Sequence, residues 1–136
     1  MASSNESVAH AFADAISHQD VSALAELMTE NHRFIDSLGN VVEGREKMRA
    51  GWAGYFRMVP DYTVTIDETY SGGSVVVMIG SAQGTYSRDG KPAAEQSQAN
   101  RWRTPAVFRA VVKDGKIAEW RVYADNEPIR RLIAKG

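Results

Sequence analysis

The stretch that decides the fold is KDGKIAEWRVYAD, from Lys113 to Asp125. Asp114-Gly115 is typical of a two-residue β-hairpin loop, because a type I′ turn requires positive φ at both central positions. The residues on either side are rich in β-branched and aromatic side chains. The sequence therefore predicts two long antiparallel strands, over residues 100–112 and 117–125, joined at this turn.

A two-residue loop also fixes which side chains share a face of the hairpin. It places Thr104 opposite Asp125 and Phe108 opposite Arg121, and cross-strand partners lie on the same face. One face is then expected to carry Trp102, Thr104, Ala106, Phe108, Arg121, Tyr123 and Asp125. The other face is expected to carry Val107, Arg109, Val111, Trp120 and Val122.

Upstream of the hairpin, apolar residues recur at helical spacing. Ser3–Glu6 fits a capping box for a first helix, and Asp20 is placed to cap a short second one. Gly44 opens a third helix, which ends before Pro60. Strands are expected over residues 33–36, 41–42, 62–70 and 75–86. Helices followed by hairpin strands indicate one α+β domain over residues 1–136 with an antiparallel sheet.

Composition excludes several classes of protein. The chain of 136 residues has 16 Lys+Arg against 17 Asp+Glu and no cysteine. The balanced and scattered charges offer no basic stripe for nucleic acid. The lack of cysteine excludes a Cys-type metal site. His10, His18 and His32 lack metal-ligand spacing, so we expect no metal and no cofactor. With no signal peptide and no membrane-spanning run, the expected location is the cytoplasm.

The order of elements, and the segment Asp114–Asp125 above all, resembles the nuclear transport factor 2-like, or SnoaL-like (polyketide cyclase-like), superfamily. The resemblance implies a cystatin-like α+β roll, in which a cone-shaped curved antiparallel sheet wraps around the three helices and encloses an apolar pocket. It also implies a homodimer through the outer sheet face, here Trp120, Val122 and Val107. Members include cyclases, isomerases, epoxide hydrolases and non-catalytic binding domains, so the fold leaves the activity open.

Two acidic residues match catalytic positions of this superfamily. Asp125 corresponds to the acid that ends the last strand in the cyclases, and Asp36 to the base of the ketosteroid isomerases. A carboxylate against apolar walls has a raised pKa and works as an acid or base near neutrality. Alternatively, Asp125 caps a terminal helix or forms an Asx turn, and Asp36 stabilises the turn at residues 38–40.

The more specialised activities of the superfamily are not expected. The isomerases use a Tyr and an acid as oxyanion donors, and those positions here are Phe12 and Ala106. The epoxide hydrolases use an Asp-Arg-Asp set, and the strand facing Asp125 offers Thr104 and Ala106 instead. What remains is a pocket with a single catalytic acid, as in the cyclases of the superfamily.

The pocket wall is predicted to be aromatic. The candidates are Trp52, Tyr55, Trp102 and Tyr123, with Arg121 to hold an anionic group and His32 to assist. Each also has a purely structural interpretation, as core packing or as a surface salt bridge. Two functions follow: acid/base cyclase, isomerase or dehydratase chemistry next to a carbonyl of an apolar or aromatic substrate, or non-catalytic binding of such a molecule.

Overall fold

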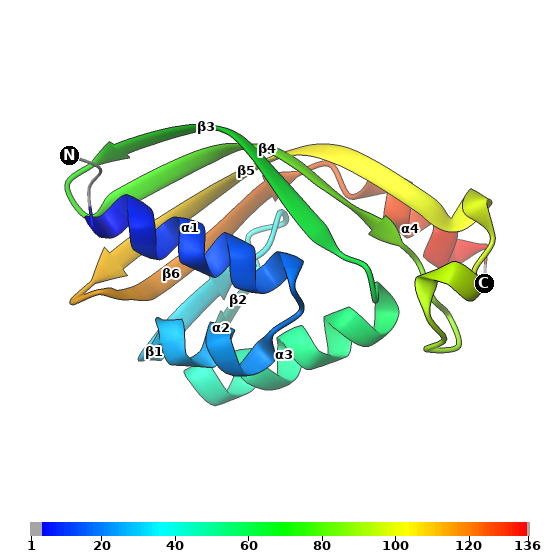
Figure 1. Cartoon of the computed structure of the whole chain (residues 1–136), viewed down its shortest axis with the longest axis horizontal. Coiled ribbons are helices and arrows are strands. Elements are labelled where there is room, and N and C mark those ends of the chain that lie inside the picture. The colour runs from blue at the N-terminus through cyan, green and yellow to red at the C-terminus, as the bar shows by residue number, and fades with distance from the viewer. Residues whose placement is uncertain (1–3, 136) are drawn as a thin grey trace.

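Three helices lie against the concave side of one strongly bent sheet, as Figure 1 shows, and a fourth helix lies at one end of it. The computed structural model describes residues 4–135. The helices are α1 (Ser4–Ser17), α2 (Val21–Leu27), α3 (Arg45–Met58) and α4 (Glu127–Ala134). The strands are β1 (Met28–Ile35), β2 (Val41–Glu43), β3 (Thr63–Gly72), β4 (Val75–Thr85), β5 (Arg101–Lys113) and β6 (Lys116–Ala124). Short 3₁₀ turns at Ala93–Glu95 and Gln98–Asn100 link β4 to β5.

The sheet has the order β2-β1-β6-β5-β4-β3. Its neighbours are antiparallel except for β1 and β6, which run parallel. The predicted α+β fold is therefore confirmed, but the sheet is mixed and not purely antiparallel. β1 and β6 come from distant parts of the chain, so no hairpin turn dictates their relative direction.

The local signals for the helices and the hairpin are confirmed where the structure describes them. The Asp20 side chain accepts a hydrogen bond from the Ala23 N–H at 3.0 Å, and Gly44 caps α3. Asp114 and Gly115 both have positive φ, as a type I′ turn requires. The capping box at Ser3–Glu6 begins outside the described residues.

The register of this hairpin differs from the prediction by one residue. Val112 pairs with Ile117, but Val111 pairs with Glu119, so Ala118 is an extra residue that forms a β-bulge. Beyond the bulge every side chain of β6 points to the opposite face from the one expected, because side chains alternate along a strand. The pairing ends at Ala106 with Ala124, so Thr104 does not face Asp125.

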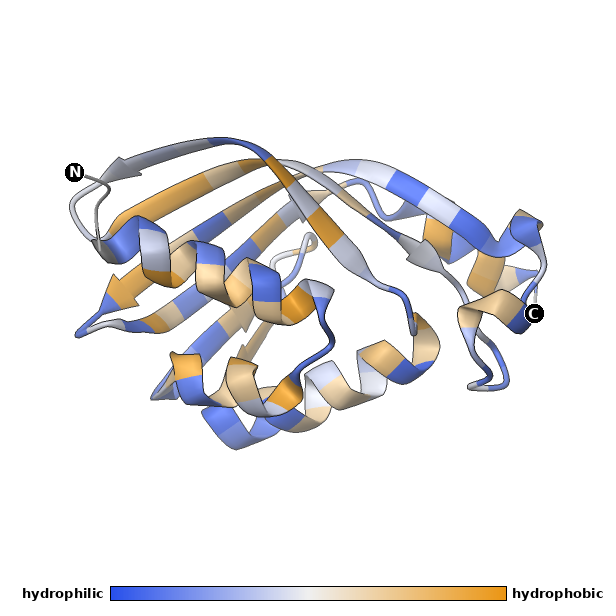
Figure 2. Ribbon diagram, viewed as in Figure 1, coloured by the Kyte–Doolittle hydropathy of each residue, from blue (hydrophilic) through white to orange (hydrophobic). Residues whose placement is uncertain are grey.

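The bulge directs Trp120 into the core. Its side chain is fully buried, stacked on Phe108 with ring centroids 5.6 Å apart, and its ring centroid lies 4.6 Å from that of Phe12 on α1. Trp120 thus belongs to the inner face, and the expectation that it lies in a dimer interface is wrong. Val122 also lies on the inner face, partly buried against the core. Figure 2 shows hydrophobic residues alternating with hydrophilic ones along β5 and β6.

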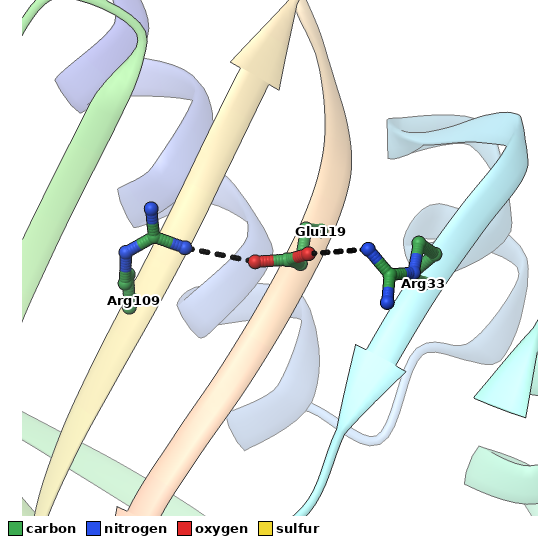
Figure 3. Close-up of polar contacts among 3 residues, drawn as sticks. All are labelled: Arg33, Arg109 and Glu119. Carbon is green, nitrogen blue, oxygen red and sulfur yellow. Dashed lines mark hydrogen bonds and ion pairs between the residues drawn. The ribbon is translucent and has the colours of Figure 1, made fainter. Parts of the chain in front are cut away.

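The outer face of the sheet carries charged side chains instead. Glu119 accepts hydrogen bonds from Arg109 at 2.8 Å and from Arg33 at 3.3 Å, linking β5, β6 and β1 on the side away from α1 (Figure 3). The Arg121 guanidinium lies over the Tyr123 ring, 4.8 Å from its centroid. Networks of this kind stabilise a surface more than isolated pairs do.

Gly80 on β4 is required by close backbone contact with β3. A Cβ atom at Gly80 would lie 1.7 Å from the carbonyl oxygen of Thr65, next to a second bulge at Asp67. We predict that Gly80→Ala lowers the free energy of unfolding by about 2 kcal/mol or more, because the strands must separate. A Cβ at Gly72 meets nothing within 4 Å, so Gly72→Ala should change the free energy of unfolding far less. Urea unfolding of both variants tests this, and equal losses would contradict it.

Candidate functional site

A cavity of about 290 Å³ opens between α3, the ends of β1 and β6, and the start of β3. Its walls are mainly apolar and aromatic, with a few polar groups. They comprise Phe34, Asp36, Ser37, Val42, Met48, Gly51, Trp52, Tyr55, Tyr62, Val122 and Asn126. The volume is near the lower limit of the roughly 300–1,000 Å³ typical of ligand pockets, so it suits one small molecule.

A chain of aromatic rings forms much of the wall. Trp52 on α3 contacts Phe34 on β1 and Tyr55 one turn further along the helix, both edge to face, with centroids 5.8 and 6.3 Å apart. Tyr55 meets Tyr62 edge to face at 4.9 Å. Helical spacing brings Met48, Trp52 and Tyr55 to one side of α3, which is why the third helix supplies so much of the cavity.

The Tyr55 and Tyr62 hydroxyls are the unusual polar feature of this wall. Neither makes a hydrogen bond to any group in residues 4–135, and neither belongs to the fully buried unpaired polar atoms found there, so both hydroxyls are accessible from the cavity. Burial raises the pKa of both phenols, and the nearby Tyr55 raises that of Tyr62 further. Both therefore stay protonated at neutral pH and can donate hydrogen bonds to a bound molecule.

A second hollow of about 240 Å³ adjoins the first and reaches the surface beside α4. The two share Asp36, Ser37, Tyr55 and Asn126. The outer hollow adds Leu38, Met58, Ile129, Arg130 and Ile133. The Asn126 Nδ2 donates to the Ser37 hydroxyl at 3.3 Å, which ties the start of α4 to the β1–β2 turn.

Asp36 is one of the two predicted acids, and it does line the cavity. Its Oδ1 accepts the backbone N–H groups of Leu38 and Asn40, both at 2.9 Å, and its Oδ2 accepts the Asn40 side-chain amide at 3.1 Å. Partial burial acts to raise the pKa of Asp36, but the hydrogen bonds from Asn40 and Leu38 outweigh it and lower that pKa below its usual range. Asp36 therefore stabilises the turn and is a weak base.

Asp125 is not in either hollow. It is exposed, and its Oδ1 accepts the backbone N–H of Glu127 at 3.0 Å, an Asx turn that directly precedes α4, whose N-cap residue is Asn126. The bulge at Ala118 is the cause, because it sends Val122 inward and Asp125 outward. Of the alternative interpretations of Asp125, the structure supports the Asx turn.

Of the predicted ligand-binding residues, the structure brings Trp52 and Tyr55 together in the cavity and places four others elsewhere. Trp102 is buried against Tyr62, with centroids 6.0 Å apart, but does not line the cavity. Arg121 and Tyr123 lie on the outer face, for the same reason as Asp125. His32 lies in the core, where its Nδ1–H donates to the Ile117 carbonyl at 2.8 Å.

Sequence reasoning missed Tyr62, Val122 and Asn126 as cavity residues. The sequence predicts Tyr62 as the first residue of a half-buried strand, and alternation along that strand does not show that the turn after α3 brings it against Tyr55. Val122 and Asn126 follow from the bulge, and no residue type marks an alanine bulge in advance.

Neither a metal site nor a membrane span is found in the part of the chain that the structure describes. Among residues 4–135, no three His, Asp or Glu side chains gather in a way that would hold a metal ion. Within the same range, no helix has the length and apolar composition needed to cross a bilayer.

Residues 9–120 match the SnoaL-like domain family, so the chain belongs to that family. Comparison with curated protein sequences gave no match.

Solved structures share the fold. A putative SnoaL-like polyketide cyclase from Jannaschia sp. CCS1 has a TM-score of 0.80 at 23% identity, covering 98% of this chain and 93% of its own. A cystatin-fold protein from Novosphingobium aromaticivorans has a TM-score of 0.70 at 25% identity, covering 87% of this chain and 96% of its own. An LEH-like epoxide hydrolase from M. tuberculosis has a TM-score of 0.77 at 15% identity, covering 98% of this chain and 91% of its own.

His32 makes stability depend on pH. Burial lowers its pKa, against the opposing effects of the Ile117 hydrogen bond and the Glu119 charge. Below about pH 6.5 the unfolded chain therefore takes up a proton that the folded chain does not, and stability falls as pH falls. We predict that the free energy of unfolding decreases from pH 7.5 to 5.5 by up to about 1.4 kcal/mol per pH unit from this group.

Urea unfolding at the two pH values checks this. His32→Asn keeps an amide that can donate to Ile117 but does not titrate, so its loss should be smaller. The matched variant His18→Asn, at an exposed histidine, should follow the wild type. An unchanged pH dependence in His32→Asn would contradict the assignment.

Proposed function

We propose that this protein binds one small apolar or aromatic molecule that carries a hydrogen-bond acceptor, such as a carbonyl oxygen. The observation that carries the proposal is the pair of phenols, Tyr55 and Tyr62, which line an apolar cavity without a hydrogen-bond partner among the described residues. Both hydroxyls are accessible from the cavity and free to donate, so an acceptor on a bound ligand can pair with them there.

The rest of the cavity fits the same kind of ligand. Trp52 and Phe34 offer flat aromatic surfaces, and Val122 and Met48 offer aliphatic ones. Burying the ligand's apolar surface supplies affinity of roughly 25 cal/mol per Å², and the two hydroxyls orient the ligand. Membership of the SnoaL-like family, whose fold relatives include proteins named as cyclases and epoxide hydrolases, supports a small-molecule role.

Acid/base chemistry as a cyclase, isomerase or dehydratase is the second candidate. It would depend on Asp36, the carboxylate that lines the cavity. Asp36 uses both oxygens in its turn and has a lowered pKa, which makes it a weak proton acceptor. Binding is therefore the function that the geometry supports best.

A variant that fills the cavity tests the location of the site. Gly51 and Gly54 both lie inside α3, but only Gly51 lines the cavity. A Cβ on either meets its nearest atom at an ordinary distance, 3.5 Å for Gly51 and 3.7 Å for Gly54. We predict that Gly51→Leu abolishes binding of 2-acetonaphthone, whereas Gly54→Leu leaves it intact. Both variants should be as stable as the wild type or up to about 1 kcal/mol more stable, because Leu favours helix over Gly.

Isothermal titration with two probes completes this experiment. 2-Acetonaphthone offers an acceptor and 2-ethylnaphthalene does not, although their shapes are similar. The ketone should bind the wild type several-fold more tightly. Binding that survives in Gly51→Leu would contradict the location of the site, and equal affinity for the two probes would contradict the role of the phenols.

We also propose that the protein forms a homodimer through the outer face of the sheet. No helix covers this face in residues 4–135 (Figure 1). Val107 pairs with Ile79 on one side and with Tyr123 on the other, which makes an apolar row across β4, β5 and β6. Tyr123 is 46% exposed there. Aromatic and aliphatic side chains at the centre of a patch with charges around them are typical of interfaces.

Analytical ultracentrifugation tests the dimer. We predict that the wild type sediments as a dimer and that Val107→Asp sediments as a monomer, because a buried unpaired charge opposes association. Val41→Asp, on the exposed part of β2, should remain dimeric. A monomeric wild type, or a dimeric Val107→Asp variant, would contradict the proposed interface.

A further inference from the structure

We propose that the ligand is an amphipathic carboxylic acid whose largely apolar part, with the acceptor that meets Tyr55 and Tyr62, fills the cavity and whose carboxylate binds Arg130 at the mouth. This inference rests on the proposed function, because it needs the same cavity to be the binding site. It adds the chemical class of the ligand and the direction in which the ligand lies.

The two hollows give the ligand a continuous path. They share Asp36, Ser37, Tyr55 and Asn126, so the outer hollow begins where the inner one ends. The inner end is aromatic, and Arg130 on α4 lines the outer end. A molecule that follows this path has an apolar body and one charged end that reaches the surface.

Arg130 is available to bind an anion. It forms no ion pair in residues 4–135, whereas the next residue, Arg131, is paired with Glu127 at 3.0 Å. The α4 helix presents these two arginines in different directions, since successive helical positions are about 100° apart. Only Arg130 lines the hollow. The planar guanidinium binds a carboxylate through two parallel hydrogen bonds.

The surroundings of Arg130 favour a ligand that is otherwise apolar. Ile129, Ile133 and Met58 line the same hollow, and their side chains reduce the water around an ion pair there. Asp36 is the opposing charge in this hollow. Its two oxygens accept three hydrogen bonds from Leu38 and Asn40, which offset part of its negative charge. Arg130 is therefore the group in the hollow that is free to bind an ion.

Paired probes test the inference. Isothermal titration compares 6-acetyl-2-naphthoate, which has a ketone at one end and a carboxylate at the other, with its methyl ester, which has the same rings and ketone and no charge. We expect the carboxylate to bind the wild type about fivefold more tightly than the ester, and this advantage to shrink as salt rises. Arg130→Gln should lose the advantage and keep the affinity for the ester. Arg131→Gln should behave as the wild type, because Arg131 does not line the hollow.

The outcomes separate this inference from the proposed function. If neither probe binds the wild type, the proposed function fails and the inference falls with it. If both bind but Arg130→Gln leaves their affinity ratio unchanged, the cavity is a binding site and only the carboxylate at Arg130 is wrong. The assignment to Arg130 is also wrong if Arg131→Gln reduces the preference for the carboxylate over the ester as much as Arg130→Gln does.

Discussion

The bulge at Ala118 is the constraint on which the rest of the structure depends. Without it, Trp120 would point away from the helices and Arg121 would point into the core. With it, Trp120 is fully buried between Phe108 and Phe12, and it joins the sheet to α1. Burying so large an aromatic side chain contributes more than most single contacts in a domain of this size. One extra residue thus determines the orientation of the last strand.

The orientation of β6 also decides which of its side chains line the cavity. Past the bulge, Val122 lines the cavity, while Tyr123 and Asp125 lie outside it. The cavity therefore lacks the acid at the end of β6 that the superfamily resemblance implied. Its polar character comes instead from α3 and the start of β3, where Tyr55 and Tyr62 meet, and from the mouth, where Asn126 and Arg130 lie. Neutral donors inside and a cation at the mouth suit recognition better than proton transfer.

Much of the fold could be predicted from the sequence, because its signals are local. Asp114-Gly115 specifies a turn, Asp20 and Gly44 specify helix starts, and alternation specifies strands. The α3 side of the cavity could be predicted for the same reason, since helical spacing alone groups Trp52 with Tyr55. The β6 side could not, because register depends on packing in three dimensions and a one-residue shift exchanges the two faces. The parallel pairing of β1 with β6 is similarly a long-range choice.

The three tryptophans allow a direct test of where a ligand binds. Trp52 lines the cavity, whereas Trp102 and Trp120 are buried outside it. Each contributes one indole N–H signal to a ¹H–¹⁵N correlation spectrum, which can be recorded while 2-acetonaphthone is added to the protein. We expect the Trp52 signal to shift strongly and saturably, and the Trp102 and Trp120 signals to move little. A saturable shift confined to Trp102 or Trp120, or no shift at all, would contradict the location of the site.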